Sequence, residues 1–393
     1  MNASLLGACL VLMVVQYLAF VPWAAAVGLM PRRLSGSNLL IGLASAAGFG
    51  LLLGLYLNSN NDPKVLANWG RFYFSFLHLQ LGLDFFVLAF LAILTLWPKG
   101  GAVALAAFQE GLRQPTYWLL LLAGWSIMLV STIIPFFTFG EDIKVVKELC
   151  FVFAMVMPGI FGLLAASISV SEEIEGRTAV TLMSKPIMRR DFLLGKFVGI
   201  ALAALTMTIF LGWWLVWVVL LKDYLDPPLV PQVVPDADWI VSLRSFFGQG
   251  SVSDLVRGMC LWITDAGEAL PGLAIGFCQV MVLTALAVAL ATRVPMVVNL
   301  VTCVAVFFLG HLTTILTEVT ARGNALVRFI AQLFDTILPG LDFFDIGPAV
   351  VRDNPLPPMD YAVYALHVTL YGLTFTVIAL LLGLILFEDR DLA

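Results

Sequence analysis

Long apolar runs alternate with short polar segments along the whole chain. Nine runs of about 20 residues or more carry almost no charge, at roughly 4–30, 38–57, 73–97, 117–138, 149–170, 197–221, 271–291, 296–316 and 361–387. A run of this length crosses a bilayer as an α-helix, because the helix satisfies every backbone polar group within the segment. The pattern predicts an all-α integral membrane protein with about nine transmembrane helices.

Two of the polar interruptions are much longer than the others, at about 222–270 and 317–360. We interpret both as loops on the outer side of the membrane. In the first loop, WIVSLRSFF at 239–247 predicts a short amphipathic segment at the membrane interface. In the second, an apolar stretch at 325–347 is broken by charges and by Pro339, which predicts a re-entrant or surface-lying helix pair.

Composition and charge agree with a membrane location and indicate which segments face the cytoplasm. The chain is 61% hydrophobic and 12% charged, whereas soluble domains carry about 25% charge. If the C-terminus is cytoplasmic, the inner segments hold 11 of the 21 Lys and Arg residues in about half the length of the outer ones. Because Lys and Arg collect on the inner side, we expect a multi-pass protein of the cell membrane, such as a bacterial inner membrane. Its N-terminus then lies outside.

The segment at 171–196, SEEIEGRTAVTLMSKPIMRRDFLLGK, lies between two spans and is unusually rich in charge. Nine of the chain's 21 Lys and Arg and 26 Asp and Glu residues fall in these 26 positions. Residues 172–184 lack proline and predict a short helix, which Pro186 ends. One interpretation is an ordinary solvated loop. The other is a short cytoplasmic helix that docks into a groove of a partner protein, with its charges setting the register.

The residues of this segment resemble the cytoplasmic signature of ABC-2-type transporter permeases. The match reads E-x-E-G-R-T-x-x-x-L-x-x-K-P-x-x-R-R-x-F-L-L-G-K, although many members have the glycine directly before the threonine, where Arg177 intervenes here. In that family the segment forms a coupling helix that contacts the ATP-binding subunit. The resemblance therefore implies an ATPase-coupling role for Glu172, Glu173, Glu175, Gly176, Arg177, Thr178, Leu182, Pro186, Arg189, Arg190, Gly195 and Lys196.

Three further stretches resemble the same family in the same order. AFQEGLRQPTYWLLLLAG at 107–124 is similar to its amphipathic interfacial helix and first core span, with Glu110 and Arg113 on the helix. ILPGLDFFDIG at 337–347 is similar to the segment before its last span, and FEDRDL at 387–392 to its charged end. The resemblance implies a six-span core of the type V exporter kind over 98–393, preceded by a three-span extension over 1–97.

The sequence contains no phosphate-binding loop of the G-x-x-x-x-G-K-[ST] type. We therefore expect no cofactor on this chain, with ATP and Mg²⁺ bound by a separate ATP-binding subunit. The resemblance also implies a second permease copy or homologue, because the family's membrane core works as a dimer. No basic block suggests a nucleic-acid partner.

Other candidate chemistry is sparse. Gln80 and Asp84 share a helix face and define a possible intramembrane polar site, with a structural contact to a neighbouring span as the alternative. Single cysteines and histidines lack metal-ligand spacing. The leading hypothesis is a permease that exports an unknown substrate by alternating access. The alternatives are a membrane anchor or scaffold of an assembly complex, or an enzyme on lipid-linked substrates that would use outer acids such as Asp335, Asp342 and Asp345.

Overall fold

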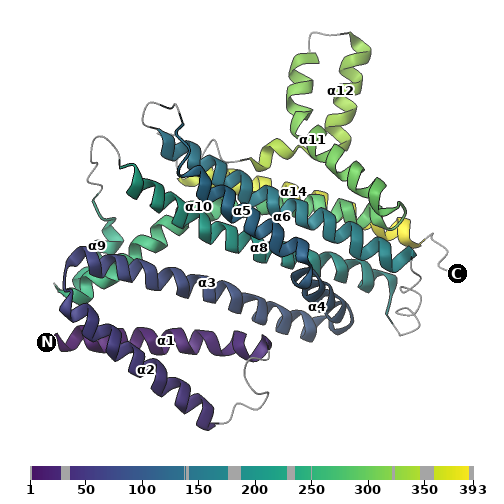
Figure 1. Ribbon diagram of the computed structural model, residues 1–393. Coiled ribbons are helices and arrows are strands. Elements are labelled where there is room, and N and C mark those ends of the chain that lie inside the picture. The colour runs from purple at the N-terminus through teal and green to yellow at the C-terminus, as the bar shows by residue number, and fades with distance from the viewer. Residues whose placement is uncertain are drawn as a thin grey trace. The chain divides into compact units, whose positions relative to one another are not determined.

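The computed structural model is predominantly helical over the residues that it describes (Figure 1). It describes residues 2–27, 36–136, 138, 141–175, 187–227, 235–248, 250–320, 324–345 and 358–388. In chain order the elements are α1 (Ala3–Val27), α2 (Gly36–Ser59), α3 (Pro63–Leu96), α4 (Pro98–Arg113), α5 (Pro115–Ser131), α6 (Asp142–Glu175), α8 (Arg189–Leu225), α9 (Asp238–Phe246), α10 (Ser251–Ala291), α11 (Met296–Thr320), α12 (Ala325–Ile337), the 3-10 turn η1 (Leu341–Phe344) and α14 (Pro358–Glu388).

Each of the nine predicted spans corresponds to one of these helices. Eight helices in the described part of the chain are long and apolar enough to cross a membrane. The ninth predicted span corresponds to α5, which is apolar but shorter. The all-α membrane fold with about nine transmembrane helices is confirmed.

The prediction of a loop over 222–270 was wrong for its second half. α9 occupies the predicted amphipathic segment, but α10 begins at Ser251, about 20 residues before the predicted span. Its 41 residues extend for about 60 Å at 1.5 Å per residue, twice the thickness of a bilayer's hydrocarbon core. Asp265 and Glu268 ended the apolar run in the sequence, with Asp254 and Arg257 before them, but an α-helix does not require apolar residues along its whole length.

The loop predicted over 317–360 contains helical structure where it is described. α11 continues to Thr320, α12 follows and η1 comes after it. Most side chains of α12 are exposed, including Phe329 and Ile337, and Ala331 is buried. A surface-lying or re-entrant position for this segment stays a prediction.

The Cα positions separate into two compact units. The first combines Met1–Ala92 with Pro228–Glu268, and the second combines Ile93–Pro227 with Ala269–Ala393. The N-terminal spans thus form a unit with α9 and the first part of α10. The predicted functional division at residue 98 stays a prediction.

Glycines bring helices of the first unit into close contact. A Cβ atom on Gly258 of α10 would collide with the carbonyl oxygen of Ala67 on α3, and one on Gly70 would collide with that of Leu255. Small residues allow this approach, and it is typical of membrane helices, where packing rather than water exclusion drives association. Arg71 of α3 and Asp265 of α10 add an ion pair at 3.3 Å.

A charge network fixes α9 to the start of α10. The Arg257 guanidinium donates to Asp236 at 2.7 and 2.8 Å, and Arg244 of α9 donates to the same carboxylate at 3.0 Å. These contacts, those of Arg257 first, hold the pKa of Asp236 below its usual range. The charges that interrupted the hydropathy pattern therefore stabilise helix packing.

This network predicts a pH-dependent stability of the first unit. A carboxyl group whose pKa is lowered by folding stabilises the protein above about pH 4, and this contribution is lost as the pH falls toward the lowered pKa. We expect the thermal unfolding temperature of wild type to fall more steeply than that of Asp236→Asn between about pH 6 and pH 3. Asp238→Asn, at an exposed position on α9, should follow wild type. Parallel curves for wild type and Asp236→Asn would rule out this contribution.

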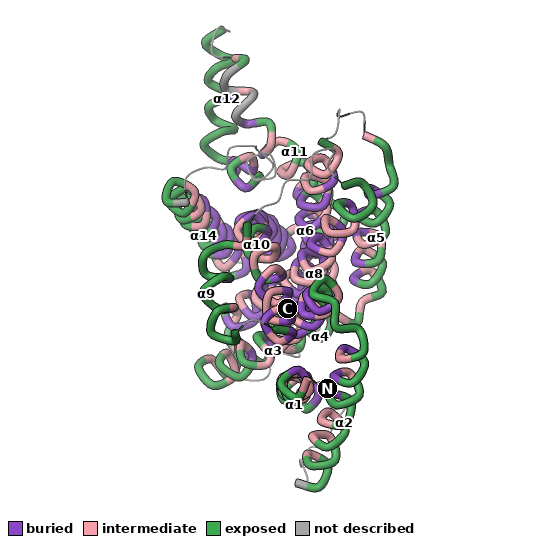
Figure 2. The backbone as a smooth tube through the Cα atoms, turned by 90° about the vertical axis from the view of Figure 1, so that its left-hand side faces the viewer, coloured by how far each residue is buried: buried purple, intermediate pink, exposed green. Residues whose placement is uncertain are grey.

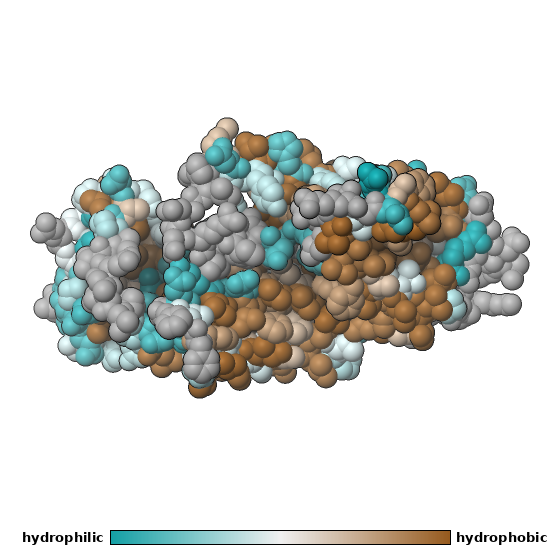
Figure 3. Space-filling view, turned by 90° about the horizontal axis from the view of Figure 1, so that it is seen from above, coloured by the Kyte–Doolittle hydropathy of each residue, from teal (hydrophilic) through white to brown (hydrophobic). Residues whose placement is uncertain are grey.

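The second unit is a helix bundle built around α6, α8 and the end of α10. The most apolar windows of α6 and α10 are 67% buried, against 11% for α1, α2 and α3, and Figure 2 shows the buried residues along α6, α8 and α10. Hydrophobic residues also cover much of the surface seen in Figure 3. Exposed apolar surface of this extent is expected where lipid, not water, surrounds the protein.

Candidate functional site

A buried lysine joins three helices of the second unit. The Lys196 ammonium on α8 donates to Glu173 Oε1 of α6 at 2.6 Å, to Ser169 Oγ of α6 at 2.8 Å and to Glu110 Oε2 of α4 at 3.2 Å. Ser169 in turn donates to Glu110 at 3.0 Å. Lys196 is 4% exposed, and its three N–H donors have three acceptors, so the buried charge is fully paired. We refer to these four residues as the Lys196 cluster.

The cluster forms because α4 and α8 pack closely. Gly195 and Gly199 lie four residues apart on the face of α8 that meets α4. A Cβ on Gly195 would lie 2.7 Å from the carbonyl oxygen of Gly100, and one on Gly199 would lie 2.7 Å from the Ala107 Cβ. With no side chains in the way, the backbones approach until Glu110 reaches Lys196.

A second contact fixes the start of α8 to the start of α4. The indole N–H of Trp97, the residue just before α4, donates to Asp191 Oδ1 at 2.8 Å. Asp191 lies in the first turn of α8, where a carboxylate also interacts favourably with the helix dipole. The polar contacts at Asp191 and Lys196 therefore attach α4 to α8 at two places. These places lie more than one helical turn apart along α8.

Two arginines bind the end of the last helix. Arg189 Nη1 donates to the carbonyl oxygens of Phe387 at 2.7 Å and Glu388 at 2.6 Å, and its guanidinium lies 5.6 Å from the Phe387 ring centre. Arg293, in the turn between α10 and α11, donates to the Leu386 carbonyl at 2.7 Å. The final carbonyls of a helix have no partner within it, so cations here satisfy them and complement the helix dipole.

Arg190 and several polar side chains of α4 are among the exposed residues at this end of the bundle. The Arg190 side chain is 65% exposed and lies 3.9 Å from Asp191. Gln109, Glu110, Arg113 and Gln114 line an open recess of about 500 Å³. These side chains are available to another molecule.

The structure brings together three residues that the sequence placed in two different segments. Glu110 was predicted on an interfacial helix, and Glu173 and Lys196 in the coupling segment; they form one cluster. Ser169 and Arg293 were missed, and only the spacing of Ser169 four residues before Glu173 was a sequence signal. Glu172 and Glu175 lie in the last turn of α6, with side chains outside the described set. The remaining predicted residues, Gly176, Arg177, Thr178, Leu182 and Pro186, lie outside the described residues.

The predicted intramembrane polar pair lies in the first unit. Gln80 Nε2 is 3.5 Å from Asp84 Oδ1 and 3.4 Å from the Ala19 carbonyl oxygen of α1. The pair thus links α3 to α1, which is the geometry of a structural contact between spans. Among the described residues, no group of three or more His, Cys, Asp or Glu side chains could hold a metal ion.

The fold and this site define a multi-pass helical membrane protein with a polar helix junction at one end of its bundle. The sequence matches the family described as ABC-2 family transporter protein over residues 86–392. That match covers most of the chain, which therefore belongs to this family, the membrane-spanning permeases of ABC transporters. No curated protein shows a significant match to the sequence.

Proposed function

We propose that the chain is the permease of an ABC exporter and moves its substrate by alternating access, driven by a separate ATP-binding subunit. The Lys196 cluster carries this proposal. It attaches the last turns of α6 to the first turns of α8, at the two ends of the charged segment at 171–196. A force applied to that segment would therefore act on α6, α8 and α4 together, because one buried charge holds all three.

The direction of insertion follows from the distribution of basic residues. We place the Lys196 cluster end of the bundle in the cytoplasm, the N-terminus outside and the chain in the cell membrane, since Arg189, Arg190, Lys196 and Arg293 gather at this end.

The proposed assembly contains two permeases and two ATP-binding subunits. ATP and Mg²⁺ would bind to the partner, because this sequence has no phosphate-binding loop. The second permease would be another copy of this chain or a homologue, and the transport path would lie between the two.

Contacts within the described part of the coupling segment support a division of roles among its residues. Glu173 and Arg189 bind within this chain, whereas Arg190 is exposed beside them. We therefore assign Arg190 to ATPase contact, and Glu173, Arg189, Gly195 and Lys196 to holding the helices that the ATPase moves. Arg113 and the recess beside it would extend the contact surface.

Arg190→Glu tests this assignment. Reversing an exposed interface charge should weaken capture of the ATP-binding subunit, a chain with its own phosphate-binding loop, without lowering the permease's thermal stability. Lys64→Glu, at an exposed position on the first turn of α3, is the matched control and should leave capture unchanged. Co-purification from membranes measures both; equal capture by wild type and Arg190→Glu would refute the contact.

A further inference from the structure

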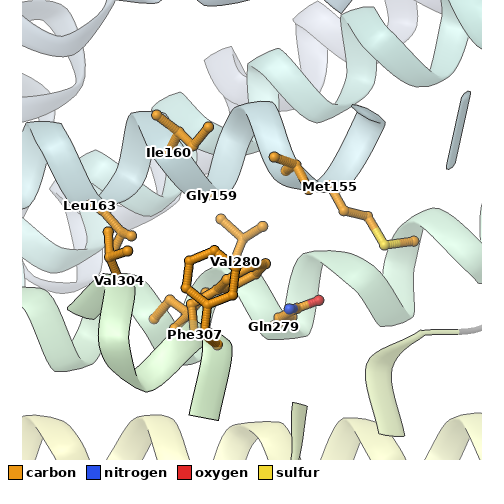
Figure 4. A pocket seen from close by; sticks show the side chains of 11 residues that line it. Met155, Gly159, Ile160, Leu163, Gln279, Val280, Val304 and Phe307 are labelled. Atoms are coloured by element: carbon orange, nitrogen blue, oxygen red, sulfur yellow. The ribbon is translucent and has the colours of Figure 1, made fainter. Parts of the chain in front are cut away.

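The second unit contains an apolar cavity between three membrane helices. It has a volume of about 270 Å³ and is lined by α6, α10 and α11 (Figure 4). Leu163, Val280 and Leu283 form a buried floor, whereas Val304 and Phe308 are exposed at its rim. The cavity therefore opens on the apolar outer surface of the unit, from which a molecule dissolved in the membrane can reach it.

One polar side chain lies among the lining residues. Gln279 of α10 is 7% exposed and lines the cavity. The His311 Nδ1–H donates to the Phe307 carbonyl oxygen at 2.8 Å, because a carbonyl can only accept. In the neutral ring, His311 Nε2 then accepts from Gln279 Nε2 at 3.1 Å. Within the described part of the chain Gln279 Oε1 makes no hydrogen bond and is not fully buried, so this acceptor is available to a ligand.

The depth of the site makes this free acceptor significant. Gln279 lies 12 residues before the end of α10, about 18 Å along the helix and near the middle of a hydrocarbon core about 30 Å thick. Polar groups at this depth are costly unless they have partners. His311 satisfies one face of the Gln279 amide and fixes its orientation, which leaves the carbonyl oxygen for a hydrogen-bond donor.

Size and lining define the ligand class. Small-molecule pockets occupy about 300–1,000 Å³, so this cavity holds only part of a ligand. Its lining carries no charged residue, which disfavours an ion or a charged headgroup. We infer that the cavity binds the hydrocarbon chain of a neutral amphipathic molecule whose hydroxyl or amide group donates to Gln279, and that this molecule belongs to the substrate class of the permease. The assignment of this molecule to the substrate class rests on the proposed transport function.

Gly159 offers a clean way to fill the cavity. It lines the cavity on α6, and a Cβ placed there has no neighbouring atom within 4 Å. A leucine at this position projects into the space without forcing the helices apart. Gly48 of α2 has equally open surroundings in the other unit, so Gly48→Leu is the matched control.

The test uses photolabelling of the full-length chain in lipid nanodiscs. The probes are a diazirine-bearing dodecanol and the same alkane without its hydroxyl group, with labelled residues mapped by mass spectrometry. We expect the alcohol to label the lining of α6, α10 and α11, with labelling lost in Gly159→Leu and kept in Gly48→Leu. Gln279→Met should reduce labelling by the alcohol about fivefold, the effect of one hydrogen bond, and leave the alkane unchanged.

Two results would overturn the inference. Undiminished labelling in Gly159→Leu would place the ligand elsewhere. Equal labelling by alcohol and alkane, unchanged in Gln279→Met, would show that only bilayer chains fill the space. ATP hydrolysis by the partner subunit is measured separately. Cavity-specific labelling without any coupled ATPase would support the binding site and reject the transport role. Coupled hydrolysis with unspecific labelling would support the transport role and reject the binding site.

Discussion

Replacing Lys196 with methionine is expected to destabilise the protein by about 1–3 kcal/mol and to abolish coupling to the ATP-binding subunit. Methionine fills a similar volume but leaves Glu110 and Glu173 facing one another without the cation that both bind. Breaking a fully buried ion pair costs about 3–5 kcal/mol because the remaining charges stay desolvated, and the cost is smaller here because solvent reaches Glu110 (42% exposed) and Glu173 (26% exposed). Thermal unfolding in detergent measures the first effect, and ATP hydrolysis by the reconstituted complex measures the second.

A triple variant separates the charge effect from packing. Lys196→Met combined with Glu110→Gln and Glu173→Gln removes all three charges, and should regain most of the lost stability because an uncharged replacement of a buried ion pair is often neutral. Lys64→Met, at an exposed lysine on α3, should behave as wild type. If Lys196→Met unfolds no more easily than Lys64→Met, the cluster does not hold the three helices together.

Gly199→Ala should destabilise the second unit although alanine is the better helix former. The added methyl group would collide with the Ala104 carbonyl oxygen and lie 2.7 Å from the Ala107 Cβ, which forces α4 away from α8. Overpacking of this kind costs about 1–3 kcal/mol, more than the roughly 1 kcal/mol gained from helix propensity. The same displacement would lengthen the distance from Glu110 to Lys196, so ATPase coupling should fall as well.

Gly48→Ala is the control, because here the change from glycine to alanine should not lower stability. Its surroundings are open, so only the helix propensity acts and stability should be unchanged or slightly higher. Thermal unfolding of the two variants side by side gives the comparison. A Gly199→Ala protein as stable as Gly48→Ala would show that α4 tolerates displacement from α8.

The spans were predictable from sequence because the bilayer imposes one strong rule. Every backbone group must be paired within the membrane, so apolar length alone located the eight long apolar helices and the shorter α5. The first half of α10 was missed for the same reason: hydropathy treats Asp254 and Arg257 as loop residues. Their partners, Arg244 and Asp236, lie on and before α9, and a local pattern carries no information about such pairing.

The candidate site was predictable in composition and not in geometry. The family signature named Glu173 and Lys196, but it did not show that they bind each other. Glu110 lies 86 residues from Lys196, and their contact depends on the close approach of two helices at Gly195 and Gly199. Arg189 illustrates the same limit, since a motif gives a residue's position along the chain and not the direction in which its side chain points.

Arg189 and Arg293 add the last helix to the same junction. Their hydrogen bonds to Leu386, Phe387 and Glu388 tie the end of α14 to the start of α8 and to the turn before α11. The proposed coupling movement at the start of α8 would therefore reach α14 as well as α4 and α6.

Reconstitution of the permease with its ATP-binding subunit tests the proposal that this chain converts ATP hydrolysis by another subunit into transport. The full-length chain is co-expressed with the ATP-binding subunit it captures, and the complex is placed in liposomes. ATP hydrolysis by wild type should exceed that of the isolated ATP-binding subunit, and complexes with Lys196→Met should fall to the isolated rate while Lys64→Met keeps the higher one. Equal hydrolysis with and without this chain would contradict the proposed transport function.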